Sequence, residues 1–442
     1  MKQKSSNVRN KDKIVKIPRK RIGWNYRDNV PVFDTGRTLL TPTRDVWIMS
    51  SGEKHEPIET LVVATGIDKD LWQKIFSPVT IAHRIPAPLG EFAIEVWGHG
   101  LKLLSAEVDP ETSYWRIYPT GALASLIYSL GGEPVELQTR RRLKGTKIDI
   151  PGCGDKDLCL VKTGKYIGFA SKTGASYKVR DMAPTGFKVL SSSTIEDYAR
   201  VNRPYIERLV SEAREFIRQH AGEQHVYVAV SGGADSTAAA LLAVEALGPS
   251  KVTLVYADTK MEFPESHETV RKLADRLGVR LDIVSGSFDP VAEISRRGLM
   301  SRNNRWCTRI LKLEPLRRYY YSRNAKIIID GARAYESTAR ATNKRVGENP
   351  AIPGIKRLLP ILYWTRMEVQ AYLILRNAPI NPLYDKGLVR IGCILCPAMS
   401  LHELRLASKM YPGFYERVAS AIESPGVVAA REFILAGKWR KL

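Results

Sequence analysis

Residues 226 to 242 have the residue types and spacing of a phosphate-binding loop. A run rich in β-branched residues ends at Ser231, two glycines follow, and an alanine-rich run typical of a helix opens at Ala234 or Asp235. A strand, a tight turn and a helix N-terminus in this order direct backbone N–H groups and the positive end of the helix dipole at an anion. The predicted phosphate-binding residues are Ser231, Gly232, Gly233, Asp235, Ser236 and Thr237, with the alternative that Asp235 only shapes the turn.

The loop differs from the common P-loop because it has no lysine for the terminal phosphates. It resembles the SGGxDS loop of the PP-loop ATP pyrophosphatases and their sulfonucleotide-reductase relatives. Four later segments resemble motifs of the 3′-phosphoadenosine-5′-phosphosulfate (PAPS) reductases in order and spacing. They are Asp258–Glu265, in which Lys260 replaces the usual glycine, Arg305–Pro315, Gly331–Arg340 and Asn381–Pro397.

This resemblance implies roles for several polar residues. A guanidinium can bind phosphate or sulfate through two hydrogen bonds, so basic residues of these motifs are expected to hold an anionic nucleotide. Asp258 is expected to bind ribose or Mg²⁺, and Glu336 either orients an arginine or forms a structural ion pair. The predicted catalytic residues are Asp235, Lys312, Arg333 and Arg340. The predicted nucleotide-binding residues outside the loop are Asp258, Gly331, Arg333 and Glu336.

Three cysteines match cluster ligands of the resembling family, which implies a 4Fe–4S cluster held by Cys307, Cys393 and Cys396. Three thiolates leave one iron for a fourth ligand or for exogenous sulfide. A zinc site is the alternative and needs a fourth Cys or His. The candidates for a fourth ligand are Cys153, Cys159 and His402. A redox dithiol or two buried apolar cysteines at 393 and 396 remain open, and no structural disulfide is expected.

Strands and helices alternate from residue 226 onward. Strands are expected at 251–258, 280–284 and 325–330 and a helix at 264–277, with a connecting helix before them at 195–220. This alternation predicts an α/β domain with a parallel sheet covered on both faces, of the adenine nucleotide alpha hydrolase-like (PP-loop) type that the resemblance implies. In such sheets ligands lie at the carboxyl ends of the strands.

Four regions are expected along the chain: a basic disordered arm at 1–21, a region of unclear fold at 22–98, a small β-barrel at 99–190 and the PP-loop domain at 191–442. Closely spaced strands and glycine turns predict the barrel. Its order of segments resembles the PUA domain, an RNA-binding module of many tRNA- and rRNA-modifying enzymes. The alternative is an unrelated barrel that packs onto the catalytic domain.

The formal net charge of +22 favours a polyanionic partner, and nucleic acid fits best. A solvated, lysine-rich surface is the alternative. The sequence has no apolar run of membrane-spanning length and no hydrophobic core of a signal peptide, so we expect a cytoplasmic protein without a membrane partner.

These observations favour an RNA sulfurtransferase, with tRNA as the expected partner. ATP with Mg²⁺ would activate a base carbonyl, and sulfide from a sulfur donor protein would replace the oxygen. The alternative is a reductase of PAPS or adenosine 5′-phosphosulfate (APS), which would use an electron donor protein. Reductases carry a nucleophilic cysteine near their C-terminus, whereas no cysteine follows Cys396 here. A third reading is an RNA-binding protein that only senses nucleotide.

Overall fold

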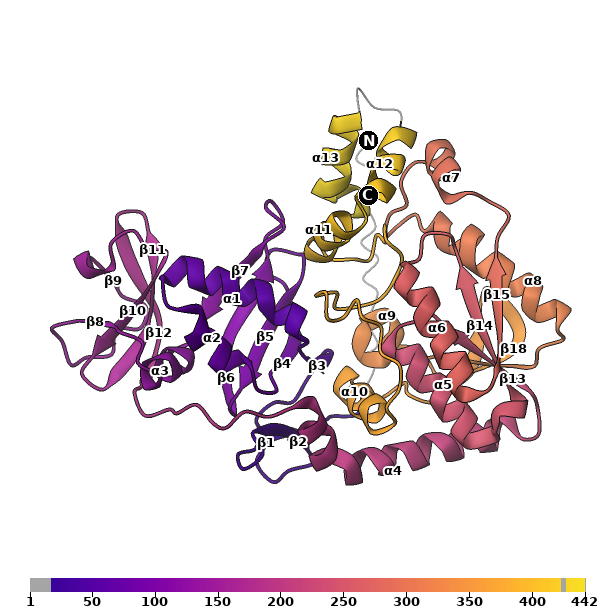
Figure 1. Cartoon of the computed structure of the whole chain (residues 1–442), viewed down its shortest axis with the longest axis horizontal. Helices are drawn as coiled ribbons and strands as arrows, with labels where there is room; N and C mark the ends of the chain where they lie inside the picture. The colour runs from indigo at the N-terminus through magenta and orange to yellow at the C-terminus, as the bar shows by residue number, and fades with distance from the viewer. Residues whose placement is uncertain (1–16, 423–426, 442) are drawn as a thin grey trace, which may run out of the picture.

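A six-stranded sheet organises the C-terminal half of the chain (Figure 1). Its order is β15-β14-β13-β16-β18-β17, and only β17 runs antiparallel to its neighbour. The strands are β13 (Val226–Val230), β14 (Val252–Asp258), β15 (Arg280–Ser285), β16 (Ile327–Ile329), β17 (Val346–Asn349) and β18 (Ile352–Leu358). The predicted α/β fold with a parallel sheet is confirmed.

Helices cover both faces of this sheet because its central strands are apolar on both sides. Val228 and Leu254 pack with α4, α5, α6 and α10, whereas Val255 and Ile328 pack with α8. These helices are α4 (Ile195–Ala221), α5 (Ala234–Leu247), α6 (Pro264–Leu277), α8 (Glu314–Ser322) and α10 (Arg366–Leu375). The other helices of this half are α7 (Pro290–Arg297), α9 (Thr338–Ala341), α11 (Leu401–Met410), α12 (Pro412–Ala421) and α13 (Val427–Ala436). A capping box of Thr194 and Asp197 starts α4, which agrees with the connecting helix expected at 195–220.

The N-terminal half contains a hairpin and two further five-stranded sheets. The hairpin is β1 (Ile22–Asn25) with β2 (Val30–Phe33), and Phe33 stacks on Tyr205 of α4. The first sheet comprises β3 (Val46–Ile48), β4 (Ile81–Ile85), β5 (Ala93–Gly98), β6 (Leu101–Val108) and β7 (Trp115–Pro119), with α1 (Ser51–Thr65) and α2 (Lys69–Phe76) inserted after β3. The second comprises β8 (Val135–Glu136), β9 (Lys147–Ile148), β10 (Leu158–Thr163), β11 (Tyr166–Thr173) and β12 (Ser176–Pro184), preceded by α3 (Gly121–Ser129).

This arrangement corrects the predicted boundary at residue 99. β5 and β6 are hydrogen-bonded neighbours in one sheet, so a boundary between residues 98 and 99 would divide a hairpin. The second sheet, at 135–184, has its own small core and is the compact β unit of this region. Its resemblance to a PUA domain stays a prediction.

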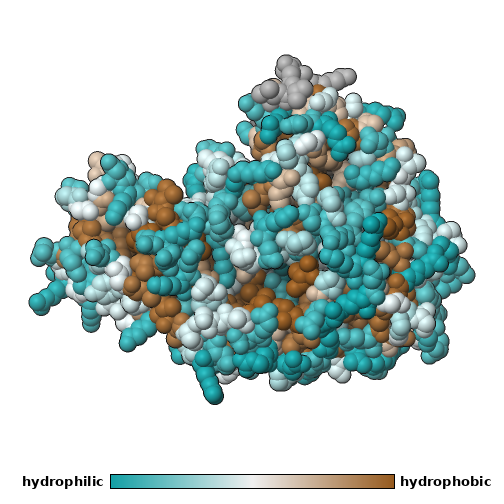
Figure 2. Space-filling view, viewed as in Figure 1, coloured by the Kyte–Doolittle hydropathy of each residue, from teal (hydrophilic) through white to brown (hydrophobic). Residues whose placement is uncertain are grey.

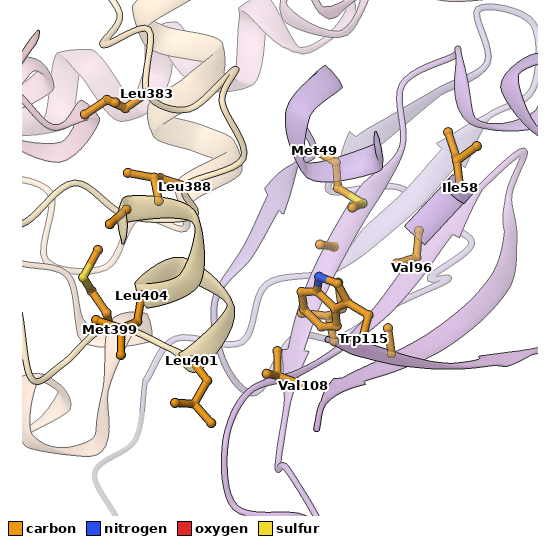
Figure 3. Close-up of a cluster of buried hydrophobic side chains, with 14 of the residues drawn as sticks. Met49, Ile58, Val96, Val108, Trp115, Leu383, Leu388, Met399, Leu401 and Leu404 are labelled. Carbon is orange, nitrogen blue, oxygen red and sulfur yellow. The ribbon is translucent and has the colours of Figure 1, made fainter. Parts of the chain in front are cut away.

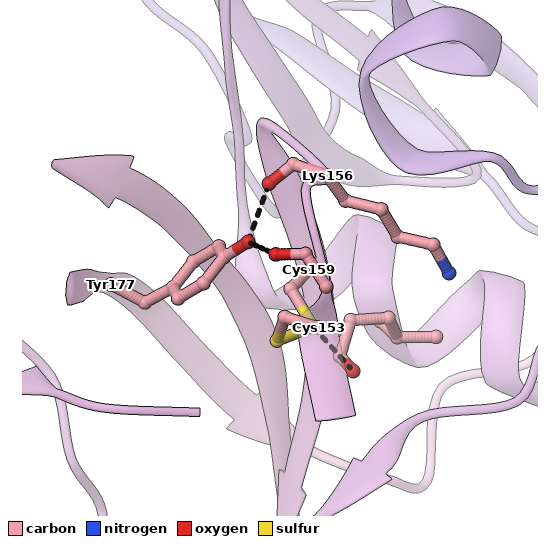
Figure 4. The surroundings of a disulfide bond; sticks show 6 residues. Cys153, Lys156, Cys159 and Tyr177 are labelled. Atoms are coloured by element: carbon pink, nitrogen blue, oxygen red, sulfur yellow. Dashed lines mark hydrogen bonds between the residues drawn. A yellow bond between two sulfur atoms is a disulfide. The ribbon is translucent and has the colours of Figure 1, made fainter. Parts of the chain in front are cut away.

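Cys153 and Cys159 form a disulfide in the second sheet (Figure 4). Both are buried, and the Tyr177 hydroxyl donates hydrogen bonds to the carbonyls of Gly154 and Lys156 in the loop that the disulfide closes. The expectation of no structural disulfide is therefore wrong. The six-residue separation brings the two Cα atoms to 5.6 Å, within the range that a disulfide requires.

One continuous hydrophobic core joins the first N-terminal sheet to the C-terminal helices. Figure 3 shows Met49, Val108 and Trp115 on the side of the N-terminal sheet and Leu388 and Leu401 facing them from the C-terminal half. A buried ion pair adds to this contact, because Arg440 Nη2 lies 2.9 Å from Glu91 Oε2. The face of the molecule in Figure 2 is mostly hydrophilic, with small apolar groups on the smaller lobe. The two halves thus share an interior.

The computed structural model describes residues 17–422 and 427–441. Most of the predicted arm at 1–21 lies outside the described residues. Its last part does not extend into solvent: Lys20 Nζ is 2.8 Å from the buried Glu368 carboxylate, and Ile17 packs beside Ala334. For these five residues the prediction of disorder is wrong. In the described ranges, no helix is both long and apolar enough to cross a membrane.

Candidate active site

The predicted phosphate loop lies between β13 and α5, at the carboxyl end of a central strand. Gly232 has φ +74°, and a Cβ there would come within 2.8 Å of the Ser266 backbone. Gly233 is the N-cap of α5 and has no side chain to satisfy the first N–H groups of the helix. Within the described part of the chain, the N–H groups of Gly232 and Gly233 have no hydrogen-bond acceptor. They are therefore available to an anion.

Side chains around the loop hold its shape. The Ser236 hydroxyl accepts a hydrogen bond from the Ser231 N–H at 3.1 Å and donates one to the Gly233 carbonyl at 2.9 Å. The Thr237 hydroxyl donates to the same carbonyl, and the Tyr384 hydroxyl accepts from the Ala234 N–H at 3.0 Å. Thr237 is thus placed as a support of the loop.

A cavity of about 760 Å³ opens at the carboxyl ends of β13, β14 and β16. At one end it is apolar, with Val255, Leu316, Tyr320 and Ile355 in its wall. The Tyr320 hydroxyl is buried and has no hydrogen-bond partner among the residues described. The predicted site residues in the cavity wall are Ser231, Gly233, Asp235, Ser236, Lys312, Gly331, Arg333, Glu336 and Arg340. Gly331 matters sterically, since a Cβ there would lie 2.5 Å from the Asp235 carbonyl oxygen.

Arg333 is held by carboxylates from two sides. Its Nη1 and Nη2 donate hydrogen bonds of 2.8 Å to the two carboxylate oxygens of Asp45, a residue of the N-terminal half. Its Nε lies 2.8 Å from Asp235 Oδ1 without hydrogen-bond alignment. Arg333 is 2% exposed. It therefore orients Asp235 and joins the two halves of the chain, and it does not project freely toward a phosphate as the sequence suggested.

Glu336 connects this network to the open cavity. Its Oε2 lies 2.9 Å from Arg340 Nε, and its Oε1 lies 3.8 Å from Arg333 Nε. Burial, together with the neighbouring Asp235 carboxylate, raises the pKa of Glu336 to about 7, against the lowering effects of Arg333 and Arg340. Both roles predicted for Glu336, orientation of an arginine and a structural ion pair, are compatible with this position.

Asp258 lies outside the cavity wall. Its Oδ1 accepts a hydrogen bond from the Lys260 N–H at 2.8 Å, and its Oδ2 accepts one from the Ser285 hydroxyl at 3.2 Å. Lys260 has φ +61°, a conformation that favours glycine, which is the residue the resembling motif carries here. The Asp258 carboxylate thus fixes the turn after β14, and its role in binding ribose or Mg²⁺ stays a prediction.

Cys307, Cys393 and Cys396 are free thiols beside the cavity, each partly buried. Cys307 precedes a π-helical turn at Thr308–Leu313, a local irregularity often found at functional sites. Burial raises the pKa of the Cys307 thiol, and Cys396 raises it further. Burial, Glu262 and Cys396 likewise hold the pKa of Cys393 well above its usual range. Cys396 is therefore close enough to raise the pKa values of both other thiols.

The three thiols are of the ligand type that holds iron–sulfur clusters. In residues 17–422 and 427–441, no three Cys, His, Asp or Glu side chains meet as the ligands of one metal ion. The cluster and the zinc alternative both stay predictions. Nor is a fourth ligand provided by the candidates: Cys153 and Cys159 are in the disulfide, and His402 Nδ1 lies 3.2 Å from Glu56. Arg305 and Lys312 oppose the rise in the pKa values of Cys307 and Cys393, respectively, but burial outweighs them, and the pKa of each thiol stays above its usual value.

Several residues of the site had no role assigned from the sequence. The N-terminal half contributes Asp45, Arg84 and Phe92 to the cavity wall. No motif in the neighbouring sequence marks these three residues as part of a site. Tyr384 and Arg390 lie in the Asn381–Pro397 segment, and this motif was the feature of the sequence that could have indicated their place in the site. Burial lowers the pKa of Arg390, but Cys396, Glu403 and Glu336 raise it above its usual value, which places this guanidinium between the thiols and the carboxylate network.

Comparison with known proteins assigns the chain to a family. Residues 225–399 match the phosphoadenosine phosphosulfate reductase domain. An uncharacterized protein of Methanocaldococcus jannaschii is 30% identical over 343 residues, which cover 74% of this chain and 80% of that protein. The chain belongs to the phosphoadenosine phosphosulfate reductase domain family.

Relatives with a named activity match shorter parts of the chain. The adenosine 5′-phosphosulfate reductase of Shouchella clausii is 28% identical over 203 residues, 45% of this chain and 82% of that enzyme. The corresponding enzyme of Salinibacter ruber is 34% identical over 146 residues, 33% of this chain and 57% of that enzyme. A solved phosphoadenylyl-sulfate reductase from Candida auris has 23% identity and a TM-score of 0.35, and covers 43% of this chain and 95% of that one.

Tyr320→Phe should stabilise the nucleotide-free protein and weaken nucleotide binding. An unsatisfied buried polar group costs about 1–3 kcal/mol, and a hydrogen bond that nucleotide supplies to it contributes about 0.5–1.5 kcal/mol, or about 3- to 10-fold in affinity. Thermal unfolding and calorimetric titration with a non-hydrolysable ATP analogue measure the two effects. Tyr321→Phe, which removes an exposed hydroxyl bonded to Pro353 O, is the matched control. Unchanged affinity would contradict a nucleotide at the apolar end.

Glu336→Gln should remove a pH dependence of stability. The pKa of Glu336 is raised to about 7 in the folded protein, so its proton stabilises the fold at pH below the unfolded value near 4.5, and that contribution is lost as the pH rises through 7. Relative to the variant, the wild type should lose about 1 kcal/mol of unfolding free energy per pH unit between these values and then level off. Urea denaturation at several pH values measures this. Glu416→Gln changes an exposed residue and is the control, and its unfolding free energy should vary with pH in parallel with that of the wild type. A parallel curve for Glu336→Gln would contradict the raised pKa of Glu336.

Proposed function

We propose that the protein is an ATP-dependent sulfurtransferase that acts on RNA, with tRNA as the substrate to test first. One observation carries the proposal: a single cavity has the phosphate loop and part of the N-terminal half in its wall and free cysteines beside it. A nucleotide alone would not need the N-terminal part of that wall. The proposal therefore assigns the cavity to two substrates.

In the first step, a carbonyl oxygen of the RNA base attacks the α-phosphorus of ATP, the bond to the bridging oxygen breaks, and pyrophosphate leaves. The free N–H groups of Gly232 and Gly233 and the dipole of α5 stabilise the negative charge on the leaving group. Lys312 lines the cavity and forms no ion pair in the described ranges, so its charge is available to the phosphates. Mg²⁺ would enter with ATP.

In the second step, hydrosulfide from a sulfur donor protein adds to the activated carbon, and AMP leaves with the former carbonyl oxygen. The exchange of oxygen for sulfur is redox-neutral, so it needs no reductant. Cys307, Cys393 and Cys396 are the residues that would hold a 4Fe–4S cluster here. When bound, such a cluster would supply a coordination position for sulfide. Arg390, whose pKa the thiols help to raise, keeps a positive charge next to them.

The charge of the N-terminal half supports RNA as the substrate. Residues 133–190, which contain the second sheet, carry 12 Lys and Arg against 6 Asp and Glu. The exposed Arg140, Arg141 and Lys147 lie in this unit. A basic surface attracts the phosphate backbone without regard to sequence. This unit would bind the body of the RNA while the cavity receives one nucleotide.

Reduction of APS or PAPS is the second candidate, because relatives of the chain include APS reductases. That reaction requires a nucleophilic thiolate. Burial raises the pKa values of Cys307 and Cys393, and Cys153 and Cys159 are joined in the disulfide. In the first proposal Cys307, Cys393 and Cys396 hold the cluster, so none of the five cysteines is left as the nucleophile, which favours sulfur transfer.

Anaerobically purified protein should produce thionucleosides in bulk tRNA, with release of AMP and pyrophosphate, when ATP, Mg²⁺ and sulfide are present. Mass spectrometry of digested tRNA is the measurement, and omission of ATP is the control. Parallel incubations with APS and PAPS test for sulfite. Sulfite release without ATP-dependent thiolation would replace the proposed function by the second candidate.

Cys393→Ala should lower the iron and acid-labile sulfide of the anaerobic protein, because it removes one of the three thiolate ligands. The double variant Cys153→Ala/Cys159→Ala is the matched control, since it removes two cysteines outside the cavity and should keep the iron. Metal analysis and the visible absorption spectrum provide the readout. Full iron content in Cys393→Ala would remove the cluster from the proposal.

A further inference from the structure

The wall that the N-terminal half contributes to the cavity contains an aromatic ring next to a guanidinium. Arg84 lies on β4, and Phe92 precedes β5. The guanidinium carbon of Arg84 is 5.2 Å from the centroid of the Phe92 ring. Trp47 and Trp115 pack against the same ring from other directions, with centroids at 6.3 and 6.0 Å, and hold it in place. Aromatic rings and guanidinium planes are the two surfaces on which proteins stack unpaired bases.

This wall lies apart from the nucleotide end of the cavity. Tyr320 and Ile355 belong to the core on the α8 face of the sheet, whereas Arg84 and Phe92 belong to the first N-terminal sheet. In Figure 1 the first N-terminal sheet lies to the left of the C-terminal half, and α8 lies at the right edge of that half. The phosphate loop thus lies between two parts of one cavity. We call them the nucleotide arm, with Tyr320 and Ile355, and the second arm, with Arg84 and Phe92. Residues 84 and 92 also lie outside the segment 225–399 that matches the family.

Charges around this second arm are unneutralised. Arg84, Arg302, Arg305 and Arg390 all line the cavity, and none of their guanidinium groups has a carboxylate within 4.0 Å among the described residues. By contrast, Arg333, Arg340 and Arg357 of the same cavity are ion-paired. The nearest polar partner of the Arg84 guanidinium is the Glu336 carbonyl, at 3.5 Å. Four arginines without counter-charges around one hollow are the arrangement that receives a ligand with several phosphates.

We propose that Arg84 and Phe92 form the seat of the acceptor nucleotide, on which one base of the RNA substrate stacks, while Arg302, Arg305 and Arg390 bind its flanking phosphates. This inference rests on the proposed function and specifies its second substrate. A base flipped out of the RNA would enter between the N-terminal wall and the phosphate loop, which brings its carbonyl oxygen toward the α-phosphate of ATP. The N-terminal half is then part of the active site as well as an RNA-binding module.

Two conservative variants test the seat. Phe92→Leu keeps an apolar side chain against Trp47 but removes the ring, and Arg84→Lys keeps the charge but removes the planar group. Each should weaken binding of a fluorescent single-stranded RNA hexamer by about 10-fold or more, as expected when one base no longer stacks. Binding of a non-hydrolysable ATP analogue should stay within about 2-fold of the wild type, since Arg84 and Phe92 lie in the other arm of the cavity. Anisotropy titrations at one fixed salt concentration measure both.

Phe288→Leu and Arg317→Lys are matched controls, because they make the same changes at exposed positions outside the cavity and should leave both affinities unchanged. Unchanged hexamer affinity in both seat variants would overturn the inference, even if the protein thiolates tRNA. A decrease in ATP-analogue affinity equal to the decrease in RNA affinity would also overturn it, because the pair would then serve the nucleotide arm or the fold. Selective weakening of RNA binding in a protein that transfers no sulfur would support the seat and overturn the proposed function.

Discussion

The ion pair between Arg333 and Asp45 is the contact on which the rest of the site depends. Arg333 follows β16 of the catalytic sheet, and Asp45 precedes β3 of the N-terminal sheet, 288 residues earlier in the chain. A guanidinium that is 2% exposed requires carboxylate partners, since an isolated buried charge costs several kcal/mol. Asp45 satisfies two of its nitrogens, and Asp235 of the phosphate loop lies against the third. One buried cation therefore sets the position of the loop and of the N-terminal sheet together.

This arrangement explains why the cavity has walls from both halves of the chain. The shared hydrophobic core and the buried Glu91–Arg440 pair hold the N-terminal sheet against the C-terminal helices, and the Arg333 network aligns it with the loop. The N-terminal half cannot then act as a loosely tethered binding module. Its Arg84 and Phe92 reach the same cavity as Ser231 and Lys312, so a ligand bound by one half is presented to the other.

The electrostatics of the cavity divide its arginines into two groups. Arg333 and Arg340 are paired with carboxylates and form part of the protein's own structure, whereas Arg84, Arg302 and Arg390 are unpaired within the described residues and face the hollow. Paired arginines lose most of their attraction for a ligand, and unpaired ones keep it. Basic residues in one motif thus have different functions, which depend on the carboxylates that the fold places near each of them.

The sequence by itself determined the phosphate loop, the alternation of strands and helices from residue 226 and the start of α4 at Thr194, because each depends on residues close together in the chain. It predicted Arg333 as a ligand of phosphate, but the charge of Arg333 is paired with Asp45, 288 residues away and beyond any local pattern. It predicted 99 as a domain boundary, but residues 99 and 100 form the short turn between β5 and β6. Only the tertiary structure decided that Asp45 neutralises Arg333, that β5 pairs with β6 and that Cys153 meets Cys159. The physical reason is that charge pairing and strand pairing are set by distance in space, whereas a motif reports only distance along the chain.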